Sequence, residues 1–292
     1  MVSPTGDRHA SGPADLLACL EDAASDAVAA APPAPRPPMA RSGKAPTSPQ
    51  RAEPFIASTP RRILALLLPR LRVERLRRPG PLAVWAQHGS HRQLVSVSAE
   101  AEAAGLREGQ ALADAQAILP GVALAPEDTA GDAVALERLA LWALRFTPLV
   151  GLEGADGLVL DITGVEHLFG GEAALRLEVL ERLARMGLSA IGAVAGTAGV
   201  AVALVRAGWS GAVPPGLEAA TVAPLSLAAL HLQPSLVGAL QGLGLRDVGS
   251  VAAQPRAGLV RRFGAALARS LDEALGHTTR PITPIRPPPE MA

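Results

Sequence analysis

Apolar runs in the middle of the chain predict several β-strands. Residues 63–68, Ile-Leu-Ala-Leu-Leu-Leu, form an uninterrupted apolar run, as expected for a strand that is buried on both faces. Pro69 ends this run, and a short basic helix is expected to follow it. Shorter apolar stretches predict further strands at residues 80–87, 92–99, 157–162 and 189–196.

Between these strands, apolar residues recur at helical spacing. Two short helices are predicted from residue 99 to residue 122, with a break between Gly105 and Gly109. Longer helices are predicted at residues 132–147, 171–187 and 199–208. This mixture of strands and helices predicts an α/β or α+β fold with a mixed sheet.

The two ends of the chain have a different pattern. Residues 1–60 are rich in Pro, Ala and Ser and predict a disordered tail. Within this tail, residues 14–28 have the pattern of a short amphipathic helix, either transient or able to dock a partner. From Pro224 onward short helices with glycine turns replace the strands, and residues 281–292 are Pro-rich, as in an extended linker.

Composition excludes several classes of protein. The 292 residues include one cysteine, Cys19, so a disulfide framework and a cysteine-based zinc site within one chain are excluded. No apolar stretch is long enough to cross a bilayer, and we therefore expect a soluble, cytoplasmic protein with no membrane partner. The 27 basic and 27 acidic residues balance, which leaves nucleic-acid binding open because a basic face can be offset elsewhere.

The stretch Gly-Ala-Asp-Gly-Leu-Val-Leu-Asp at residues 154–161 is the most informative candidate site. Asp156 and Asp161 bracket an apolar run, and two carboxylates could hold a divalent metal ion. The alternatives are the remnant of such a site, or two acids at the ends of an ordinary strand. The histidines show no metal-ligand spacing, and no motif supports a serine nucleophile.

Five segments in order resemble the Y-family translesion DNA polymerases, in particular the ImuB-like branch that has lost polymerase chemistry. They are residues 63–76, 95–122, 145–171 (Arg-Phe-Thr-Pro-Leu-Val at its start), 193–208 and 240–255. The resemblance implies an α+β fold in which a palm with a mixed sheet and inserted fingers precedes a small all-α thumb that resembles a helix-hairpin-helix. We expect the palm at residues 61–213, the fingers at about 70–130, the thumb at 214–280, and a linker at 281–292. A further little-finger domain would follow the linker in the family, so the chain is expected to be truncated after the thumb.

The resemblance also implies that the catalytic groups are lost. Active members bind two metal ions through an acid of the first strand and an Asp-Glu pair before the next palm strand. Here Ala65, or a neighbouring leucine, takes the place of the first acid, and Gly157 replaces the Glu that would follow Asp156. The Tyr and Arg that hold the triphosphate correspond to Ala99 and Glu102, and a palm lysine corresponds to Ala203.

These losses predict a non-catalytic DNA-binding or adaptor component of translesion synthesis, with a vestigial Asp156, no cofactor and no bound metal. A remnant site predicts that Asp156→Ala leaves every function unchanged. The partners implied by the resemblance are damaged or primer-template DNA, an ImuA-like RecA-related protein, an error-prone DNA polymerase III alpha-type subunit, and the sliding clamp through a missing C-terminal part. The alternatives are an active low-fidelity polymerase with displaced ligands, or a truncated fragment without function.

Contact with DNA is predicted at basic residues of the thumb. Candidate phosphate contacts are Arg246, Arg261, Arg262 and Arg269. The alternative for these arginines is that they are the solvated basic ends of helices. In the predicted hairpin, His231 and Gln233 occupy positions where such motifs carry glycine to approach a phosphate.

Overall fold

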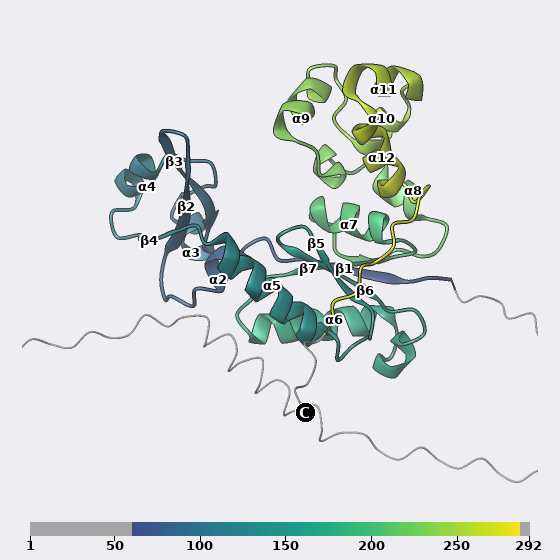
Figure 1. Ribbon diagram of the computed structural model, residues 1–292, viewed down its shortest axis with the longest axis horizontal. Helices are drawn as coiled ribbons and strands as arrows, with labels where there is room; N and C mark the ends of the chain where they lie inside the picture. The colour runs from purple at the N-terminus through teal and green to yellow at the C-terminus, as the bar shows by residue number, and fades with distance from the viewer. Residues whose placement is uncertain (1–59, 287–292) are drawn as a thin grey trace, which may run out of the picture.

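The computed structural model describes residues 60–286 (Figure 1). The predictions for residues 1–59 and for the last six residues lie outside this range. A five-stranded sheet forms the centre of the described chain, with a smaller sheet on one side and a group of C-terminal helices above it (Figure 1). The described chain thus combines a mixed arrangement of strands and helices with a C-terminal helical part, in agreement with the predicted fold class.

The central sheet has the strand order β5-β6-β1-β7-β8. Its strands are β5 (Val150–Glu153), β6 (Gly157–Asp161), β1 (Ile63–Leu67), β7 (Ile191–Ala195) and β8 (Gly211–Ala212). β1 lies in the middle and pairs antiparallel with both β6 and β7. All five residues of β1 are buried, which confirms the prediction of a strand covered on both faces.

The alternation of side chains along β1 divides the core into two layers. Leu64 and Leu66 belong to a cluster with α5 (Thr129–Ala143) and α6 (Glu172–Arg185). Ile63, Ala65 and Leu67 point to the other face, where they pack in a cluster with α7 (Ala198–Arg206) and the C-terminal helices. Figure 1 shows α6 and α7 on opposite sides of the sheet.

The smaller sheet is an insertion between β1 and α5. It contains β3 (His91–Val97), β2 (Leu82–His88) and β4 (Ala123–Pro126), in that order. Three short helices accompany it: α2 (Leu71–Glu74), α3 (Ala99–Ala103) and α4 (Leu112–Ile118). The chain enters this part through α2 and leaves it just before Asp128, which caps α5.

After β8 the described chain is helical. The elements are α8 (Glu218–Val222), η3 (Leu227–Leu230), α9 (Pro234–Gln241), α10 (Val248–Ala252), α11 (Arg256–Phe263) and α12 (Ala265–Ala274). Beyond α12 the chain returns to the central sheet, where the Ile285 N–H donates to the Val150 carbonyl over 2.8 Å. At Gly151 a Cβ atom would lie 2.7 Å from Ile282, so this crossing needs a glycine.

The sequence pattern located most elements correctly but missed β4, β5 and β8. These three strands have four residues or fewer, too short for a periodic pattern. The short 3-10 helix η2 (Glu166–Phe169) also lies where no helix was predicted. No helix among the described residues is long and apolar enough to cross a membrane.

Candidate functional site

A polar cavity of about 330 Å³ lies where the central sheet, the smaller sheet and the C-terminal helices meet. Its walls come from the end of β1, from α2, β3 and α7, from the β5–β6 turn, and from the residue after η3. The ionisable residues that line it are Arg72, Glu108, Asp156, Arg206 and His231. We call this cavity the central cleft.

Asp156, in the turn that precedes β6, is held by two hydrogen bonds from Arg206 at the end of α7. Arg206 Nη2 lies 2.7 Å from Asp156 Oδ1, and Nη1 lies 3.0 Å from Oδ2. The Arg206 side chain is 11% exposed and that of Asp156 is 37% exposed. The Asp156 carbonyl also accepts a hydrogen bond from the Leu68 N–H at 2.7 Å, which fixes the turn against the end of β1. Both carboxylate oxygens that could bind a cation therefore already bind a guanidinium.

The other two predicted metal positions carry no ligand. Ala65 is fully buried, opposite Val159 on one side and Ala193 on the other. Gly157 faces Leu67, and a Cβ atom there would lie 2.8 Å from the Glu153 carbonyl oxygen. A glutamate at this position would therefore require the hairpin to shift.

Asp161 lies at the opposite end of β6 from Asp156. At about 3.3 Å per residue, five residues separate the two Cα atoms by about 16 Å, too far to share one metal ion. Asp161 accepts hydrogen bonds from Arg61 Nε (2.8 Å) and Thr163 Oγ1 (2.6 Å). Burial alone would raise the pKa of Asp161, but the hydrogen bonds from Thr163 and Arg61 outweigh it and hold the pKa below its usual value. No group of three or more metal-ligating side chains occurs within residues 60–286.

The three residues at the predicted triphosphate-binding positions also make structural contacts instead. Ala99 begins α3, and Glu102, in the same helix, pairs with Arg70. Ala203 is buried within the core cluster beneath the C-terminal helices. Arg206 is not among the site residues predicted from the sequence, although a basic residue three positions after Ala203 lies about one helical turn further along the same face.

Glu108 is the acid of the central cleft that lacks a hydrogen-bonded partner among the described residues. Desolvation by the cleft walls raises its pKa, although part of the residue stays exposed, while the positive charge of Arg72 opposes the shift. His231, on the opposite wall, has a left-handed backbone with φ of 47°. This conformation favours glycine and fits the glycine position predicted from the hairpin resemblance.

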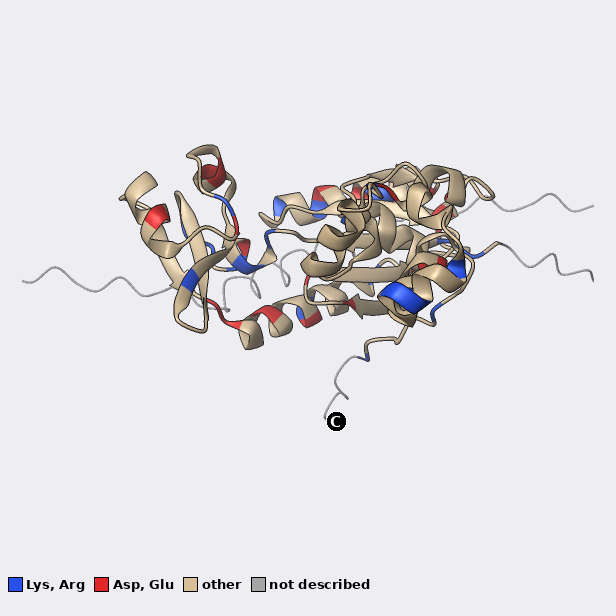
Figure 2. Ribbon diagram, turned by 90° about the horizontal axis from the view of Figure 1, so that it is seen from above, with Lys and Arg blue, Asp and Glu red and all other residues tan. Residues whose placement is uncertain are grey.

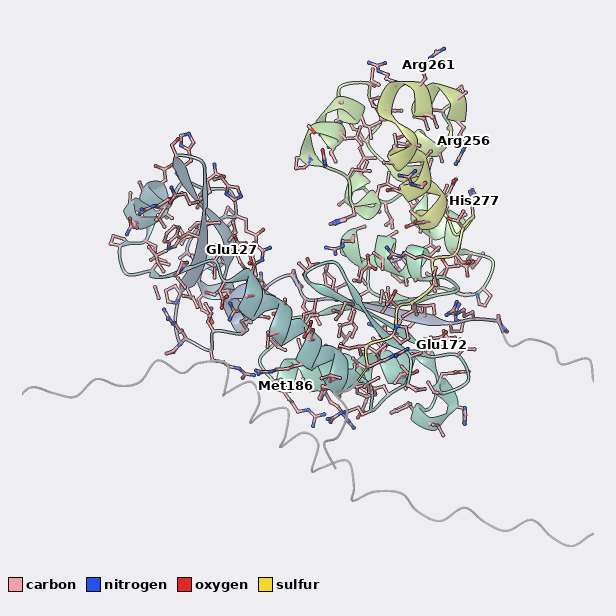
Figure 3. All side chains as sticks on the ribbon, in the orientation of Figure 1. Glu127, Glu172, Met186, Arg256, Arg261 and His277 are labelled. Carbon is pink, nitrogen blue, oxygen red and sulfur yellow. The ribbon has the colours of Figure 1, made fainter. Side chains whose placement is uncertain are left out.

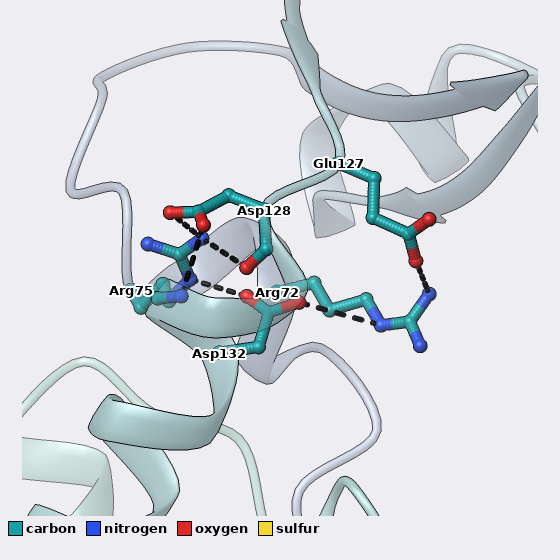
Figure 4. A network of polar contacts seen from close by, with 6 residues as sticks. Arg72, Arg75, Glu127, Asp128 and Asp132 are labelled. Atoms are coloured by element: carbon teal, nitrogen blue, oxygen red, sulfur yellow. Dashed lines mark hydrogen bonds and ion pairs between the residues drawn. The ribbon is translucent and has the colours of Figure 1, made fainter.

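An ion-pair network joins the two chain segments that connect the smaller sheet to the rest of the fold (Figure 4). Arg72 of α2 pairs with Glu127 at 2.8 Å and approaches Asp132 at 3.7 Å. Arg75 pairs with Asp132 and, at 3.0 Å, with Asp128. The side chains of Arg75 and Asp132 are only 9% and 7% exposed, so this network fixes the smaller sheet relative to α5.

The arginines predicted from the sequence to contact DNA are exposed and lie in or between the C-terminal helices. Over much of the fold, basic and acidic segments lie side by side (Figure 2), and Arg256 pairs with Asp272. By contrast, four exposed arginines of the C-terminal helices form no ion pair with any residue between 60 and 286: Arg246, Arg261, Arg262 and Arg269. Their charges are available to an anionic partner.

Residues 69–205 match the model of the impB/mucB/samB family. The protein ImuB of Caulobacter vibrioides is 48% identical over 184 residues, which cover 63% of this chain and 40% of that protein. A DNA polymerase IV of Dehalococcoides mccartyi is 31% identical over 151 residues, covering 50% of this chain and 39% of the relative. The chain thus matches less than half the length of these curated relatives.

Solved structures show the same fold at low identity. The DinB protein from Sulfolobus solfataricus aligns with a TM-score of 0.61 and 17% identity, over 76% of this chain and 69% of that one. An insertion ternary complex of the Dbh DNA polymerase aligns with the same score and coverage at 16% identity. The chain is therefore similar to ImuB, its residues 69–205 match the impB/mucB/samB family, and its fold is that of the DinB and Dbh DNA polymerase structures.

Proposed function

We propose that this chain is a non-catalytic Y-family polymerase homologue that serves as a DNA-binding adaptor in induced translesion synthesis. The observation that carries this proposal is the ion pair of Asp156 with Arg206. A two-metal mechanism needs several carboxylates around the reacting phosphate. Here two acids, Asp156 and Glu108, line the central cleft, and a guanidinium occupies the oxygens of Asp156.

The domain assignment belongs to the same proposal. The central sheet with α5–α7 would be the palm, the smaller sheet the fingers, and the helices after residue 214 the thumb. Primer-template DNA would lie between fingers and thumb, over the central cleft. The exposed thumb arginines support this placement because unpaired guanidinium groups attract phosphates and add a salt-dependent binding energy.

The protein partners are proposed from the likeness to ImuB. They are an ImuA-like RecA-related protein, an error-prone DNA polymerase III alpha-type subunit that would perform synthesis, and the sliding clamp. Co-purification of the full chain with each candidate, with and without primer-template DNA, tests this assignment. An adaptor binds at least one of them, whereas a chain that binds none contradicts the adaptor role.

Primer extension and DNA binding measured on one purified sample test the proposed activity. In Mg²⁺ or Mn²⁺ we expect binding to primer-template DNA without extension. Extension that depends on metal and is abolished by Asp156→Ala would refute the non-catalytic proposal. Absence of both binding and extension would refute the DNA-binding role.

Charge reversal in the thumb tests where DNA binds. We expect Arg261→Glu combined with Arg262→Glu to weaken DNA binding and to reduce its dependence on salt, because two phosphate contacts are lost. The matched control reverses Arg185 and Arg286, which are also exposed but lie outside both the smaller sheet and the C-terminal helices. Equal loss in both double variants would show that only net charge matters.

A further inference from the structure

A groove of about 480 Å³ lies on the C-terminal helices, away from the central cleft. Its apolar walls include Leu243 and Leu245 from the loop after α9, and Leu259 and Phe263 from α11. We call it the outer groove. Leu243 is 45% exposed, so its side chain is accessible to a partner segment.

The charge around the outer groove has one sign. Arg261 and Arg262 line it, and no acidic residue is among the described residues that form its walls. Figure 3 shows Arg261 on the side of the C-terminal helices that is turned away from the central sheet. Residues 224–276 contain five arginines and three acids, a net charge of +2. The groove therefore suits a segment that carries both apolar anchors and carboxylates.

The chain itself contains such a segment. Residues 14–28, Ala-Asp-Leu-Leu-Ala-Cys-Leu-Glu-Asp-Ala-Ala-Ser-Asp-Ala-Val, contain four acids and no lysine or arginine. In a helix, Leu16, Leu17 and Leu20 would share one face, because they are one, three and four positions apart. Glu21 would border that face, where it could reach an arginine at the rim of a groove.

The connection between the two is long enough. Pro60, the first described residue, lines a cavity together with Leu275 and His277 at the end of α12, so the tail begins beside the C-terminal helices. α12 has ten residues and spans about 15 Å. The 31 residues from 29 to 59 could extend to about 100 Å, well beyond the distance required.

We propose that residues 14–28 bind in the outer groove of their own chain, with the leucines against Leu243, Leu245 and Phe263 and with Glu21 near Arg261 or Arg262. Tethering favours this contact over one with a free peptide because it raises the effective concentration of the segment. It would also cover two of the arginines that we propose for DNA binding. The tail would then act as a competitor for one part of the DNA-binding surface.

Cys19 provides the test, since it is the single cysteine of the chain and lies within the segment. A nitroxide attached to Cys19 of the otherwise unaltered full chain should broaden the amide signals of residues 243–245 and 254–263. Combining Arg261→Glu with Arg262→Glu should restore these signals, as should replacing Leu16 and Leu20 by serine. The Arg185→Glu/Arg286→Glu control should leave the broadening unchanged.

Three results would overturn the proposal. In the first, the signals of the outer groove are not broadened. In the second, the broadened signals belong to another part of the surface. In the third, broadening appears only when spin-labelled molecules are mixed with unlabelled ones, which would indicate contact with a second copy of the chain. The expected competition with DNA rests on the proposed function, and the serine variant should bind primer-template DNA more tightly. Because the nitroxide measurement needs no DNA, failure of the contact and failure of DNA binding are distinguishable.

Discussion

Replacing Asp156 by alanine should destabilise the protein even if the residue has no role in catalysis. The substitution leaves the guanidinium of Arg206 largely buried and without its carboxylate partner. Exposed ion pairs contribute about 0–1 kcal/mol, whereas loss of one partner from a buried pair costs about 3–5 kcal/mol. Since Asp156 is more exposed than Arg206, we expect a loss of about 2 kcal/mol. For a folded region of this size, that corresponds to a decrease in Tm of about 4–8 °C.

Thermal unfolding followed by circular dichroism measures this effect. Glu181→Ala is the matched control, because Glu181 is an exposed acid of α6 for which no ion pair is seen among the described residues. Arg206→Met should be destabilising by itself, and the double variant with Asp156→Ala should lose less than the sum of the two single changes. An unchanged Tm for Asp156→Ala would mean that the pair adds no stability and that the carboxylate is available to another ligand.

This expectation refines what the sequence alone predicts for Asp156. The sequence predicts a vestigial acid whose replacement by alanine leaves every function unchanged. The ion pair gives it a structural role, so a modest loss of DNA binding in Asp156→Ala could reflect instability. Binding should therefore be compared at a temperature at which both proteins are folded, where we expect the variant to match the parent chain.

Three further perturbations test other contacts. Arg75→Ala should lower the unfolding free energy by about 3 kcal/mol, because the buried Asp132 then has only Arg72 nearby among the described residues, at 3.7 Å. Arg75→Lys should lose less stability. Equal stability of the parent chain and both variants would contradict the coupling role of the network. Asp161 has a lowered pKa, so its contribution to stability is present above the ordinary value near 3.9 and is lost as pH falls through the folded-state pKa. Asp161→Asn should therefore make the free energy of unfolding less dependent on pH below about pH 4. An unchanged pH dependence would contradict this role of Asp161. Gly199→Ala would place a Cβ against a backbone carbonyl of α12 and should cost about 1–3 kcal/mol, whereas Gly258→Ala, with open space around it, should not destabilise; comparable urea midpoints would refute the packing argument.

The main elements of the fold could be predicted from local sequence because their patterns are strong. The apolar run of β1, Pro69 after it, and the helical spacing in α5 and α6 each determine a local conformation without help from distant residues. The short strands β4, β5 and β8 carry no such pattern. They form because neighbouring strands and helices supply hydrogen bonds and cover one face, which is a property of the assembled sheet.

The candidate site, too, could be predicted from the sequence only in part. The sequence by itself determined which acids and basic residues are absent, since Ala65, Gly157 and Ala203 cannot bind a metal ion or a phosphate through a side chain in any conformation. It could not determine what Asp156 does instead, because its partner Arg206 is fifty positions away. That contact exists only once β6 and α7 pack on the same sheet. Local patterns settle conformation and chemical capability, whereas the pairing of charges depends on distances that only the tertiary structure decides.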